Sequence, residues 1–527
     1  MNQFLYPVYE RDIHDPFLLT DMEKAVNRIA LAAERGEKVS VYGDYDIDGI
    51  TASALMIEGL AALGIKAESY IPDRFSEGYG INQEALETLQ NGGTSLVISV
   101  DCGITSVEEA RWATEHGLDL IITDHHDVPP IIPKAVAVIN PKRPDDRYPF
   151  KDLAGVGVAF KVIQALQRSL GKPEQGQEKW LLDLVALGTV CDVVTLVGEN
   201  RALVSFGLRV MQRGRRIGIG ALADVGGVDA SAVSAYHLGY VLGPRMNAAG
   251  RLEHADRSLE LMRTSDPARA REIAGELNAL NLKRRADQEA IFALADKMAE
   301  EYVNDPVLVL ADAGWSHGVV GIVASKIADK WHKPVLIAQI LGDSTKGSAR
   351  SAGGFNMIGA LRAQSDLLTK FGGHAFAAGF TLPTSQLGDL RQRLNAYHTA
   401  HASQAAPDAA VTSELTLDDL SEVNLDLLTE LEMLEPHGNG NPRPKFQILG
   451  VNAEMVSRVG ADGKHLKLRV VDRSAKSLDG IGFGLGPQHV GLKVGQGLTL
   501  TGSLNKNEYL GRSSVQLVIG EINYEQI

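Results

Sequence analysis

Residues 39–49 read Val-Ser-Val-Tyr-Gly-Asp-Tyr-Asp-Ile-Asp-Gly, and this stretch decides the fold of the first part of the chain. Its apolar half predicts a short buried strand, and three aspartates at alternate positions follow it directly. A solvated turn has a similar composition, so the pattern alone is weak. The same spelling begins a calcium-binding EF-hand loop, but the twelfth position counted from Asp44 is Leu55 instead of Glu.

Further short apolar runs follow the first one, at residues 69–71, 96–100, 118–123 and 135–139. Their hydrophobicity is continuous and not alternating, which is typical of parallel strands covered on both faces. We therefore predict a doubly wound α/β domain with a parallel sheet between residue 38 and about residue 195. Open sheets of this kind carry their functional side chains beyond the carboxyl ends of the strands.

Acidic and imidazole side chains follow several of these runs. Asp101 comes after run 96–100, Asp124-His125-His126 after run 118–123, and Asp192 after an apolar segment at 184–191. A lone aspartate in such a place is usually a helix cap, but four clusters at apparent segment ends of one sheet favour a shared site. Carboxylates with imidazoles select Mn(II) or Mg(II) over zinc held by thiolates. Two such ions hydrolyse phosphoesters, so we predict a two-metal phosphoesterase.

These motifs, in this order, resemble the four motifs of the DHH phosphoesterase family. The resemblance implies that Asp46 binds a first metal ion, that Asp48 binds a second, and that the carboxylate of Asp101 bridges the two. The residues that it assigns to the two ions are Asp46, Asp48, Asp101, His125 and Asp192.

The resemblance also implies roles in catalysis for His126, Asp101 and Asp44. His126 would face the scissile phosphate and stabilise its developing charge, while Asp44 would ligate an ion or support the ligands. Many relatives have a histidine four positions before the residue that matches Asp46, whereas this chain has Tyr42. In this chain Asp44 or water would fill that ligand position.

The rest of the chain divides by pattern into three further parts. Residues 196–265 are predicted to be mostly helical, with a loop around Gly239 to Gly250. Residues 266–302 predict a long helix with a stripe that includes Leu294; it either bridges two domains or packs within one. A second α/β unit precedes a linker at 398–408, and five short strands then favour an OB-type barrel over a small sandwich. The predicted boundaries are 1–200, 201–303, 304–400 and 401–527.

Several stretches outside the metal motifs resemble the RecJ exonuclease branch of the DHH family. They include residues 71–80, 243–252, 315–325, 347–351 and 372–380, so the resemblance covers nearly the whole chain. It implies a processive 5′→3′ exonuclease that releases 5′-mononucleotides from single-stranded DNA in repair and recombination. It also implies that the second α/β unit is a DHH-associated domain that folds over the metal site and holds the nucleotide or the 5′ end.

Glycines and arginines suggest where the substrate phosphates bind. The glycine-rich stretch 372–379 lets backbone N–H groups approach a phosphate, although tight packing of a helix is an alternative. Arg350, flanked by serines, offers a fork of donors, and three more arginines are predicted in loops beside Gly or Pro. The predicted phosphate- or DNA-binding residues are Arg74, Arg245, Arg251, Ser348, Arg350, Gly372, Gly373 and His374.

Composition limits the remaining choices. The 527 residues carry a net charge of −14 and two cysteines without a CxxC pair, which fits a reducing cytoplasm and disfavours tight duplex binding. No apolar run is long enough for a membrane helix, and the start lacks the pattern of a signal peptide. We expect a cytoplasmic monomer whose partners include single-stranded DNA, a helicase and a single-strand-binding protein. Two alternatives stay open: a DHH phosphodiesterase for short oligonucleotides or RNA, and a replication scaffold with a degenerate metal site.

Overall fold

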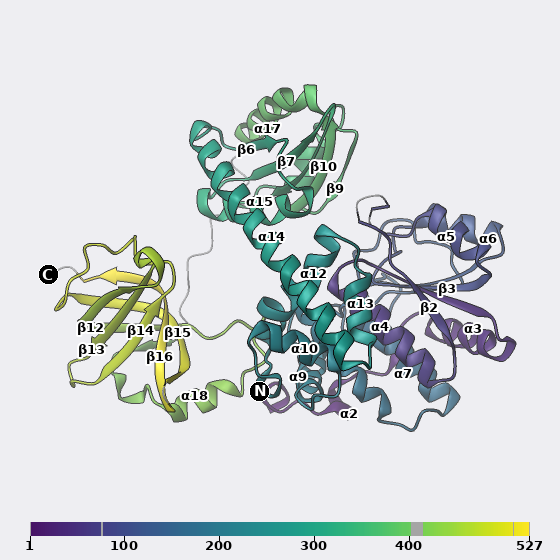
Figure 1. Ribbon diagram of the computed structural model, residues 1–527, viewed down its shortest axis with the longest axis horizontal. Helices are drawn as coiled ribbons and strands as arrows, with labels where there is room; N and C mark the ends of the chain where they lie inside the picture. The colour runs from purple at the N-terminus through teal and green to yellow at the C-terminus, as the bar shows by residue number, and fades with distance from the viewer. Residues whose placement is uncertain (1, 75–76, 79, 402–414, 510, 526–527) are drawn as a thin grey trace.

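The computed structural model describes residues 2–74, 77–78, 80–401, 415–509 and 511–525 (Figure 1). Its first part holds a five-stranded sheet in the order β2-β1-β3-β4-β5, with every neighbouring pair parallel. The strands are β1 (Lys38–Gly43), β2 (Ala67–Tyr70), β3 (Thr94–Val100), β4 (Asp119–Thr123) and β5 (Ala137–Ile139). Each is buried almost throughout except the edge strand β2, as the continuous apolar runs predict.

Helices cover both faces of this sheet, which confirms the predicted doubly wound α/β domain. One face packs against α3 (Met22–Arg35), α4 (Ile47–Ala62) and α7 (Gly155–Leu170), and the other against α5 (Gln83–Asn91) and α6 (Val107–Glu115). Alternate residues of each strand serve the two cores: Val41 and Ile98 lie in the first, and Tyr42 and Val97 in the second.

The segment after the sheet is helical, as predicted, but the expected loop between Gly239 and Gly250 is wrong. That stretch lies in the π-helical turn η4 (Leu238–Leu242) and in α12 (Gly243–Leu252). Leu238, Leu242 and Met246 are fully buried, and Gly243 allows a close approach, because a Cβ there would lie 2.7 Å from Cys191 Sγ. The glycines serve packing here and do not mark a loop. The neighbouring helices are α8 (Leu182–Cys191), α9 (Gly198–Met211), α10 (Ile217–Gly226), α11 (Ala235–His237) and α13 (Asp256–Arg263).

Helix α14 (Pro267–Glu301) connects the first two parts of the chain (Figure 1). Asp266 caps it by accepting a hydrogen bond from Ala268 N. The first half buries Ile273 and Leu277 in the core of the first domain, and the second half buries Ile291 in the core of the next. Of the two interpretations of this helix, the bridge is therefore right. Leu294 does not belong to a buried stripe, since it is 55% exposed.

The second α/β unit contains a mixed five-stranded sheet in the order β6-β7-β8-β10-β9. Only β6 and β7 are parallel. The strands are β6 (Leu308–Asp312), β7 (Val335–Leu341), β8 (Ser344–Arg350), β9 (Lys370–Gly373) and β10 (Ala377–Pro383), and the helices are α15 (His317–Trp331), α16 (Met357–Arg362) and α17 (Leu387–His401). The predicted linker at 398–408 is wrong for 398–401, which belong to α17, and its remainder lies outside the described residues.

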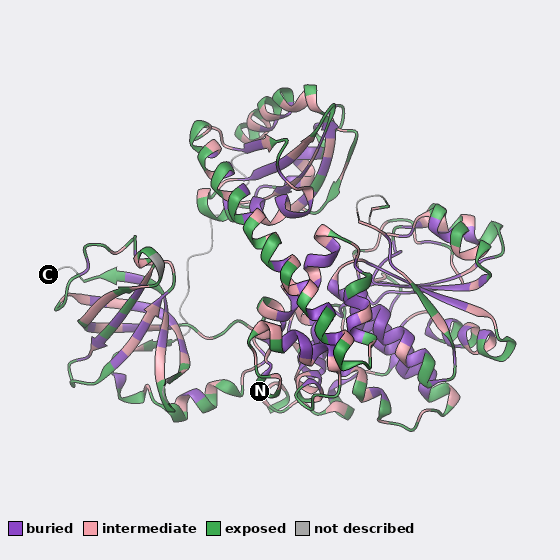
Figure 2. Cartoon of the chain, viewed as in Figure 1, coloured by how far each residue is buried: buried purple, intermediate pink, exposed green. Residues whose placement is uncertain are grey.

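The last part is a small barrel, and Figure 2 shows buried and exposed residues alternating along its strands. The strand order is β11-β12-β13-β14-β16-β15, and β12 also pairs with β15, which closes the barrel and confirms the OB-type prediction. Several strands are longer than the sequence pattern predicts. The barrel strands are β11 (Leu415–Leu417), β12 (Phe446–Val459), β13 (His465–Val471), β14 (Ser477–Gly482), β15 (Gly497–Tyr509) and β16 (Arg512–Tyr524), and α18 (Leu425–Glu432) lies between β11 and β12.

A short segment at residues 433–441, which we call the tether, fastens the barrel to the first domain. The buried Arg201 donates hydrogen bonds to the carbonyl oxygens of Met433 and Leu434 at 3.1 and 2.8 Å. Further along, the N–H of Leu196 donates to the Asn439 carbonyl at 2.7 Å. The tether therefore contacts the chain a few residues beyond Asp192. No helix within the described ranges is long and apolar enough to cross a membrane.

Candidate metal centre

The turn from β1 into α4 places the first aspartates. Asp46 caps α4, and its Oδ1 accepts hydrogen bonds from Asp48 N at 2.9 Å and Gly49 N at 3.3 Å. A helix start needs such an acceptor because its first N–H groups have no partner within the helix. Gly49 is required for the fold of the turn, since a Cβ there would lie 2.5 Å from the carbonyl oxygen of Asp44. The turn thus buries Asp44 while α4 directs Asp48 inward.

Asp48 is held by a helix that is distant in sequence. Its Oδ2 accepts from Gly155 N at 2.6 Å and its Oδ1 from Val156 N at 2.9 Å, both in the first turn of α7. The side chain is 1% exposed. Sequence reasoning missed these donors, although the Gly-Val-Gly-Val stretch at 155–158 signals close backbone packing.

Asp101 lies at the end of β3 in the left-handed region, with φ 62°. A non-glycine residue there is strained, and such strain persists where the surrounding structure imposes it. Here α7 supplies that constraint, because a Cβ on Gly155 would lie 2.5 Å from Asp101 Oδ1. The strained backbone directs a buried carboxylate toward the other aspartates.

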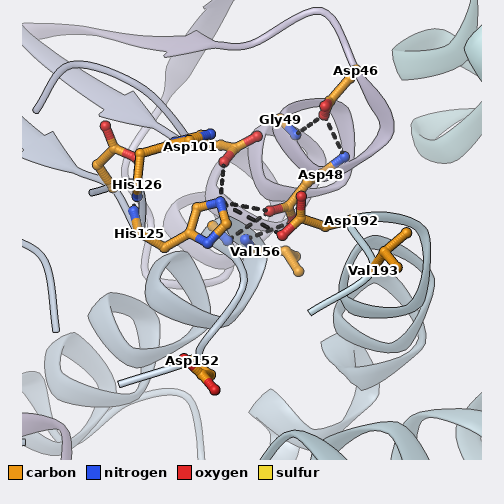
Figure 3. A network of polar contacts seen from close by, with 12 residues as sticks. Asp46, Asp48, Gly49, Asp101, His125, His126, Asp152, Val156, Asp192 and Val193 are labelled. Carbon is orange, nitrogen blue, oxygen red and sulfur yellow. Dashed lines mark hydrogen bonds and ion pairs between the residues drawn. The ribbon is translucent and has the colours of Figure 1, made fainter. Parts of the chain in front are cut away.

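His125 and Asp192 complete the arrangement shown in Figure 3. His125 Nε2 lies 3.2 Å from Asp101 Oδ1, 3.6 Å from Asp192 Oδ2 and 3.8 Å from Asp48 Oδ2. Asp192 follows α8 and not a strand, so the interpretation of residues 184–191 as a segment end of the sheet is wrong. The run is apolar because α8 is buried among helices, and its C-terminal end reaches the same edge of the sheet.

The ligand-type side chains form three overlapping groups, in each of which the donor atoms lie within 4.8 Å of one another. Asp101 and His125 each belong to two of the groups, so the three groups adjoin one another. The groups are Asp44 with Asp46 and Asp101, Asp48 with His125 and Asp192, and Asp101 with His125 and His126. The sequence-predicted metal residues are thus brought together within one centre.

Several of these atoms lack a hydrogen-bond partner in the described part of the chain although they are buried. They are Asp44 Oδ1, Asp101 Oδ1, Asp192 Oδ2 and both ring nitrogens of His125. Buried polar atoms without partners are costly and are normally satisfied. A set of carboxylate oxygens and an imidazole nitrogen is the donor set that Mn(II) and Mg(II) accept. The residues present therefore fit two divalent cations.

The electrostatics of the cluster agree with this fit. Burial, with the neighbouring charge of Asp46 second, raises the pKa of Asp48 to about 7. Burial and the charge of Asp48 raise the pKa of Asp192 to about 9, and the pKa of Asp101 is raised for the same reasons. Burial lowers the pKa of His125 to about 3, which keeps its ring neutral. Buried carboxylates that lie close together repel one another strongly, and cations bound between them relieve this repulsion.

His126 differs from its neighbour because Asp124 orients it. Asp124 is fully buried, and its Oδ1 lies 2.7 Å from His126 Nδ1 and accepts from the N–H groups of both histidines. Burial opposes protonation of His126, yet this hydrogen bond raises its pKa to about 9. The sequence predicted no separate role for Asp124, because its hydrogen bonds to the neighbouring histidines cannot be read from the motif.

Tyr42 occupies the position where many relatives have histidine. Its side chain is buried in the core on the α5 and α6 face of the sheet. The hydroxyl donates to the Gly80 carbonyl at 3.0 Å and accepts from Asn82 Nδ2 at 3.2 Å. The ring thus serves the fold, and the first group of ligands rests on its three aspartates.

The predicted arginines lie in different surroundings. Arg74 stands 5.0 Å from the ring centroid of Tyr45, beside the metal turn. The placement of Arg245 and Arg251 in loops is wrong, since both lie on α12. Arg245 is engaged with Val241 and Asn278, whereas Arg251 donates to the Gly318 carbonyl of the second unit at 3.2 Å. The error arose because the Gly-Pro pair at the start of α12 is typical of a loop and also of a helix N-terminus.

The residues predicted from the second α/β unit gather on its sheet. Arg350 donates to Ser325 Oγ at 3.1 Å, and a Cβ on Gly321 would lie 3.2 Å from both its guanidinium and Ser348 Oγ. Gly372 and Gly373 lie on β9, so the alternative of helix packing is wrong. His374 Nδ1 lies 3.7 Å from Asp127 Oδ2, and thus faces the loop that carries His126.

Comparisons with known families match three stretches of the chain. Residues 38–189 match the DHH family, N-terminal domain; residues 304–400 match the DHHA1 domain; and residues 415–521 match the RecJ OB domain. Together these stretches span most of the chain and agree with the order of the units in the fold.

Several individual relatives are named single-stranded-DNA-specific exonuclease RecJ. The chain is 39% identical to the single-stranded-DNA-specific exonuclease RecJ of Bacillus subtilis over 97% of its own length and 64% of that protein. It is 35% identical to RecJ of Salmonella typhimurium over 96% of its length and 90% of that protein. The crystal structure of Thermus thermophilus RecJ in complex with Mn²⁺ superposes with a TM-score of 0.85 and 31% identity, covering all of this chain and 74% of that one. A complex of the same enzyme with Mg²⁺ also matches.

Proposed function

The chain belongs to the RecJ family within the DHH superfamily, and on this premise we propose that it degrades single-stranded DNA from the 5′ end to 5′-mononucleotides. It is a metal-dependent phosphodiesterase that uses Mn(II) or Mg(II) and acts in DNA repair and recombination. One observation carries the proposal: buried carboxylate and imidazole atoms that have no hydrogen-bond partner among the described residues converge at the strand ends of the DHH sheet. The matched RecJ OB domain favours a long strand as substrate.

We assign the ligands by their grouping. Asp44, Asp46 and Asp101 would hold the first cation, and Asp48, His125 and Asp192 would hold the second, with Asp101 and His125 each shared with a neighbouring group. When bound, two such cations would neutralise charge on the scissile phosphate and would lower the pKa of a water molecule, so that it loses a proton and supplies hydroxide as the nucleophile. The chain's contribution is to fix these donors before substrate arrives, through α7 for Asp48 and the strained backbone for Asp101.

His126 provides the positive charge on the substrate side of the centre. Because Asp124 accepts from Nδ1, the ring is held in one orientation and carries a proton on Nε2 as well. That Nε2–H donates to a phosphate oxygen as negative charge builds up there during attack. Asp124 is a positioning residue in this reaction, since it touches the histidine and not the phosphate.

The second α/β unit binds the 5′ end of the strand. Arg350 and Ser348 supply side-chain donors, Gly372 and Gly373 supply backbone N–H groups, and His374 faces the metal loop. A set of donors of this kind suits a terminal phosphate, and binding that phosphate would give the enzyme its direction. Arg74 and Arg251 contribute charge near the metal turn.

We assign one task to each part of the chain. Residues 1–200 carry out hydrolysis, 201–303 connect, 304–400 hold the 5′ end, and 401–527 bind the strand beyond the site. We infer that the enzyme works as a monomer. We also infer that a helicase or a single-strand-binding protein delivers the strand, because the enzyme acts on single strands and not on duplex DNA.

The test is release of nucleotide from a 50-nucleotide DNA strand labelled at its 5′ end, compared with the same strand labelled at its 3′ end. With Mn(II), we expect immediate release of labelled mononucleotide from the 5′-labelled strand only, and loss of release in Asp101→Ala. Equal cleavage of dinucleotides and long strands would instead indicate a phosphodiesterase for short oligonucleotides or RNA. Inactivity on both substrates would indicate a scaffold.

A further inference from the structure

Two tyrosines near the metal centre are stacked on each other and open to solvent. Tyr236 of α11 is 62% exposed and Tyr240 of η4 is 73% exposed. Their ring centroids are 5.0 Å apart with an interplanar angle of 25°. Large aromatic side chains are usually well buried. A stacked pair that keeps this much exposed surface presents further ring area to a third flat group.

The backbone beneath the pair is held firmly. The two rings are four residues apart, which places them on one side of a helical turn. Ser234 caps the turn, with its Oγ 3.0 Å from His237 Nδ1, while Leu238 and Leu242 anchor the opposite side in the core with no exposed surface. The turn is π-helical, and such turns are frequent at functional sites.

The pair lies on a track that leads from the metal centre to the barrel. A cavity of about 680 Å³ is lined by both rings and by Cys191 and Val193, which flank the proposed ligand Asp192. A second cavity of about 630 Å³ is lined by Tyr236 and by Asn505 and Lys506 of β15. The two cavities adjoin, because both are lined by Ser234, Tyr236, Glu435, His437 and Arg443.

Basic side chains line this track as well. Arg251 and Arg284 line the cavity that Cys191 and Val193 also line, and Lys506, which is paired with Glu508 at 2.7 Å, lines the cavity at the barrel. Burial, followed by the charge of Arg74, lowers the pKa of Arg251 to about 10, so it still carries its charge at neutral pH. Arg284 Nε is buried without a hydrogen-bond partner in the described part of the chain. Glu435 also lines the track but is paired with Arg443 at 3.0 Å.

We propose that Tyr236 and Tyr240 form a stacking platform for unpaired bases of the strand on the 3′ side of the scissile phosphate. Rings for bases and guanidinium groups for phosphates are the combination by which proteins hold single strands without regard to sequence. Bases within a duplex are stacked on each other and do not offer their faces, so the platform contributes to the choice of single-stranded DNA. This inference rests on the proposed function, and it names residues that set the substrate class.

The test measures binding of a 20-nucleotide thymidine strand with a 5′ phosphate and a 3′ fluorophore, in EDTA so that no hydrolysis occurs. Fluorescence anisotropy is recorded for a series in which a block of four abasic sites moves along the strand. We expect wild-type affinity to fall most when the block occupies one window of positions. In a Tyr236→Leu/Tyr240→Leu variant, affinity for the intact strand falls on the order of 10- to 100-fold, and the abasic window disappears.

Two controls separate stacking from loss of structure. A Tyr236→Phe/Tyr240→Phe variant keeps the rings and retains the window, with affinity within about threefold of wild type. Trp180→Leu changes an exposed aromatic residue at 40% exposure outside both cavities and leaves every affinity unchanged. An equal loss for intact and window-abasic strands in the leucine variant, or an unchanged window, overturns the platform.

The outcomes also separate this inference from the proposed function. If wild type shows the window but releases no nucleotide with Mn(II), the exonuclease proposal fails and the platform stands. If wild type degrades the strand and the leucine variant keeps the window, the platform alone fails.

Discussion

Substituting Gly155 by alanine tests how the metal centre is held together. Gly155 opens α7, where its N–H donates to Asp48 and its Cα lies against Asp101. A Cβ at this position would lie 2.5 Å from Asp101 Oδ1 and 2.6 Å from Asp101 Cβ. Ordinary contacts begin near 3.4 Å, so the carboxylate or the helix must move by about 0.9 Å.

A displacement of this size has a large effect on hydrolysis. Misplacing a reacting group by about 1 Å costs on the order of 10²-fold in rate, which corresponds to about 2.7 kcal/mol of transition-state stabilisation. Stability changes less, because overpacking costs about 1–3 kcal/mol while alanine gains about 0.5–1 kcal/mol over glycine within a helix. Gly155→Ala should therefore fold, bind Mn(II) more weakly and lose about 100-fold in rate.

Gly157→Ala is the matched control on the same helix. A Cβ there meets only Leu153, at 3.4 Å, which is an ordinary contact. This variant should keep wild-type activity and gain slightly in stability. Mn(II) binding by calorimetry, thermal unfolding and single-strand hydrolysis are measured for both variants. The reasoning is refuted if Gly155→Ala binds Mn(II) as wild type does and hydrolyses DNA within about threefold of the wild-type rate.

Three further predictions concern stability and coupling. Removing divalent ions with EDTA should lower the thermal midpoint, and Mn(II) at 100 times its Kd should restore about 2.7 kcal/mol; an unchanged midpoint would contradict a cation site among the carboxylates. Asn439→Ala removes the hydrogen bond to the Val193 carbonyl at 2.8 Å, worth about 1 kcal/mol, and should weaken Mn(II) binding about fivefold, whereas Asn523→Ala on β16 should not. The hydrogen bond from Arg11 lowers the pKa of Asp12 from 3.8 to about 2, so its stabilisation is complete above 3.8 and is lost as the pH falls through 2; the stability difference between wild type and Asp12→Asn should shrink over that range.

Much of the metal centre could be predicted because its residues follow strands. The carboxyl ends of parallel strands meet at one edge of a sheet, so aspartates and histidines directly after β1, β3 and β4 must lie close together. The groups that hold these ligands in place could not be predicted in the same way. Asp48 depends on N–H groups 107 and 108 residues away, and no local pattern encodes a contact over that distance.

The wrong secondary-structure predictions concern buried helices whose sequence patterns resemble those of strands or loops. Residues 184–191 are apolar on every side because α8 packs among helices, and such a run cannot be distinguished from a strand by its pattern. The glycines of η4 and α12 indicated a loop, but they permit close packing against Cys191 and other neighbours. The stacked tyrosines were missed for the same reason, since a site expected to be a loop gave no fixed spacing between Tyr236 and Tyr240.

The path to the barrel and the metal centre meet at Val193. This residue has φ 64°, which is unfavourable for a β-branched side chain, and it directly follows the proposed ligand Asp192. The tether holds it there, since Asn439 donates to its carbonyl and the N–H of Leu196 donates back to Asn439. Val193 also lines the cavity that contains the tyrosine pair. A strand that fills this cavity as proposed would therefore contact Val193, the residue next to Asp192.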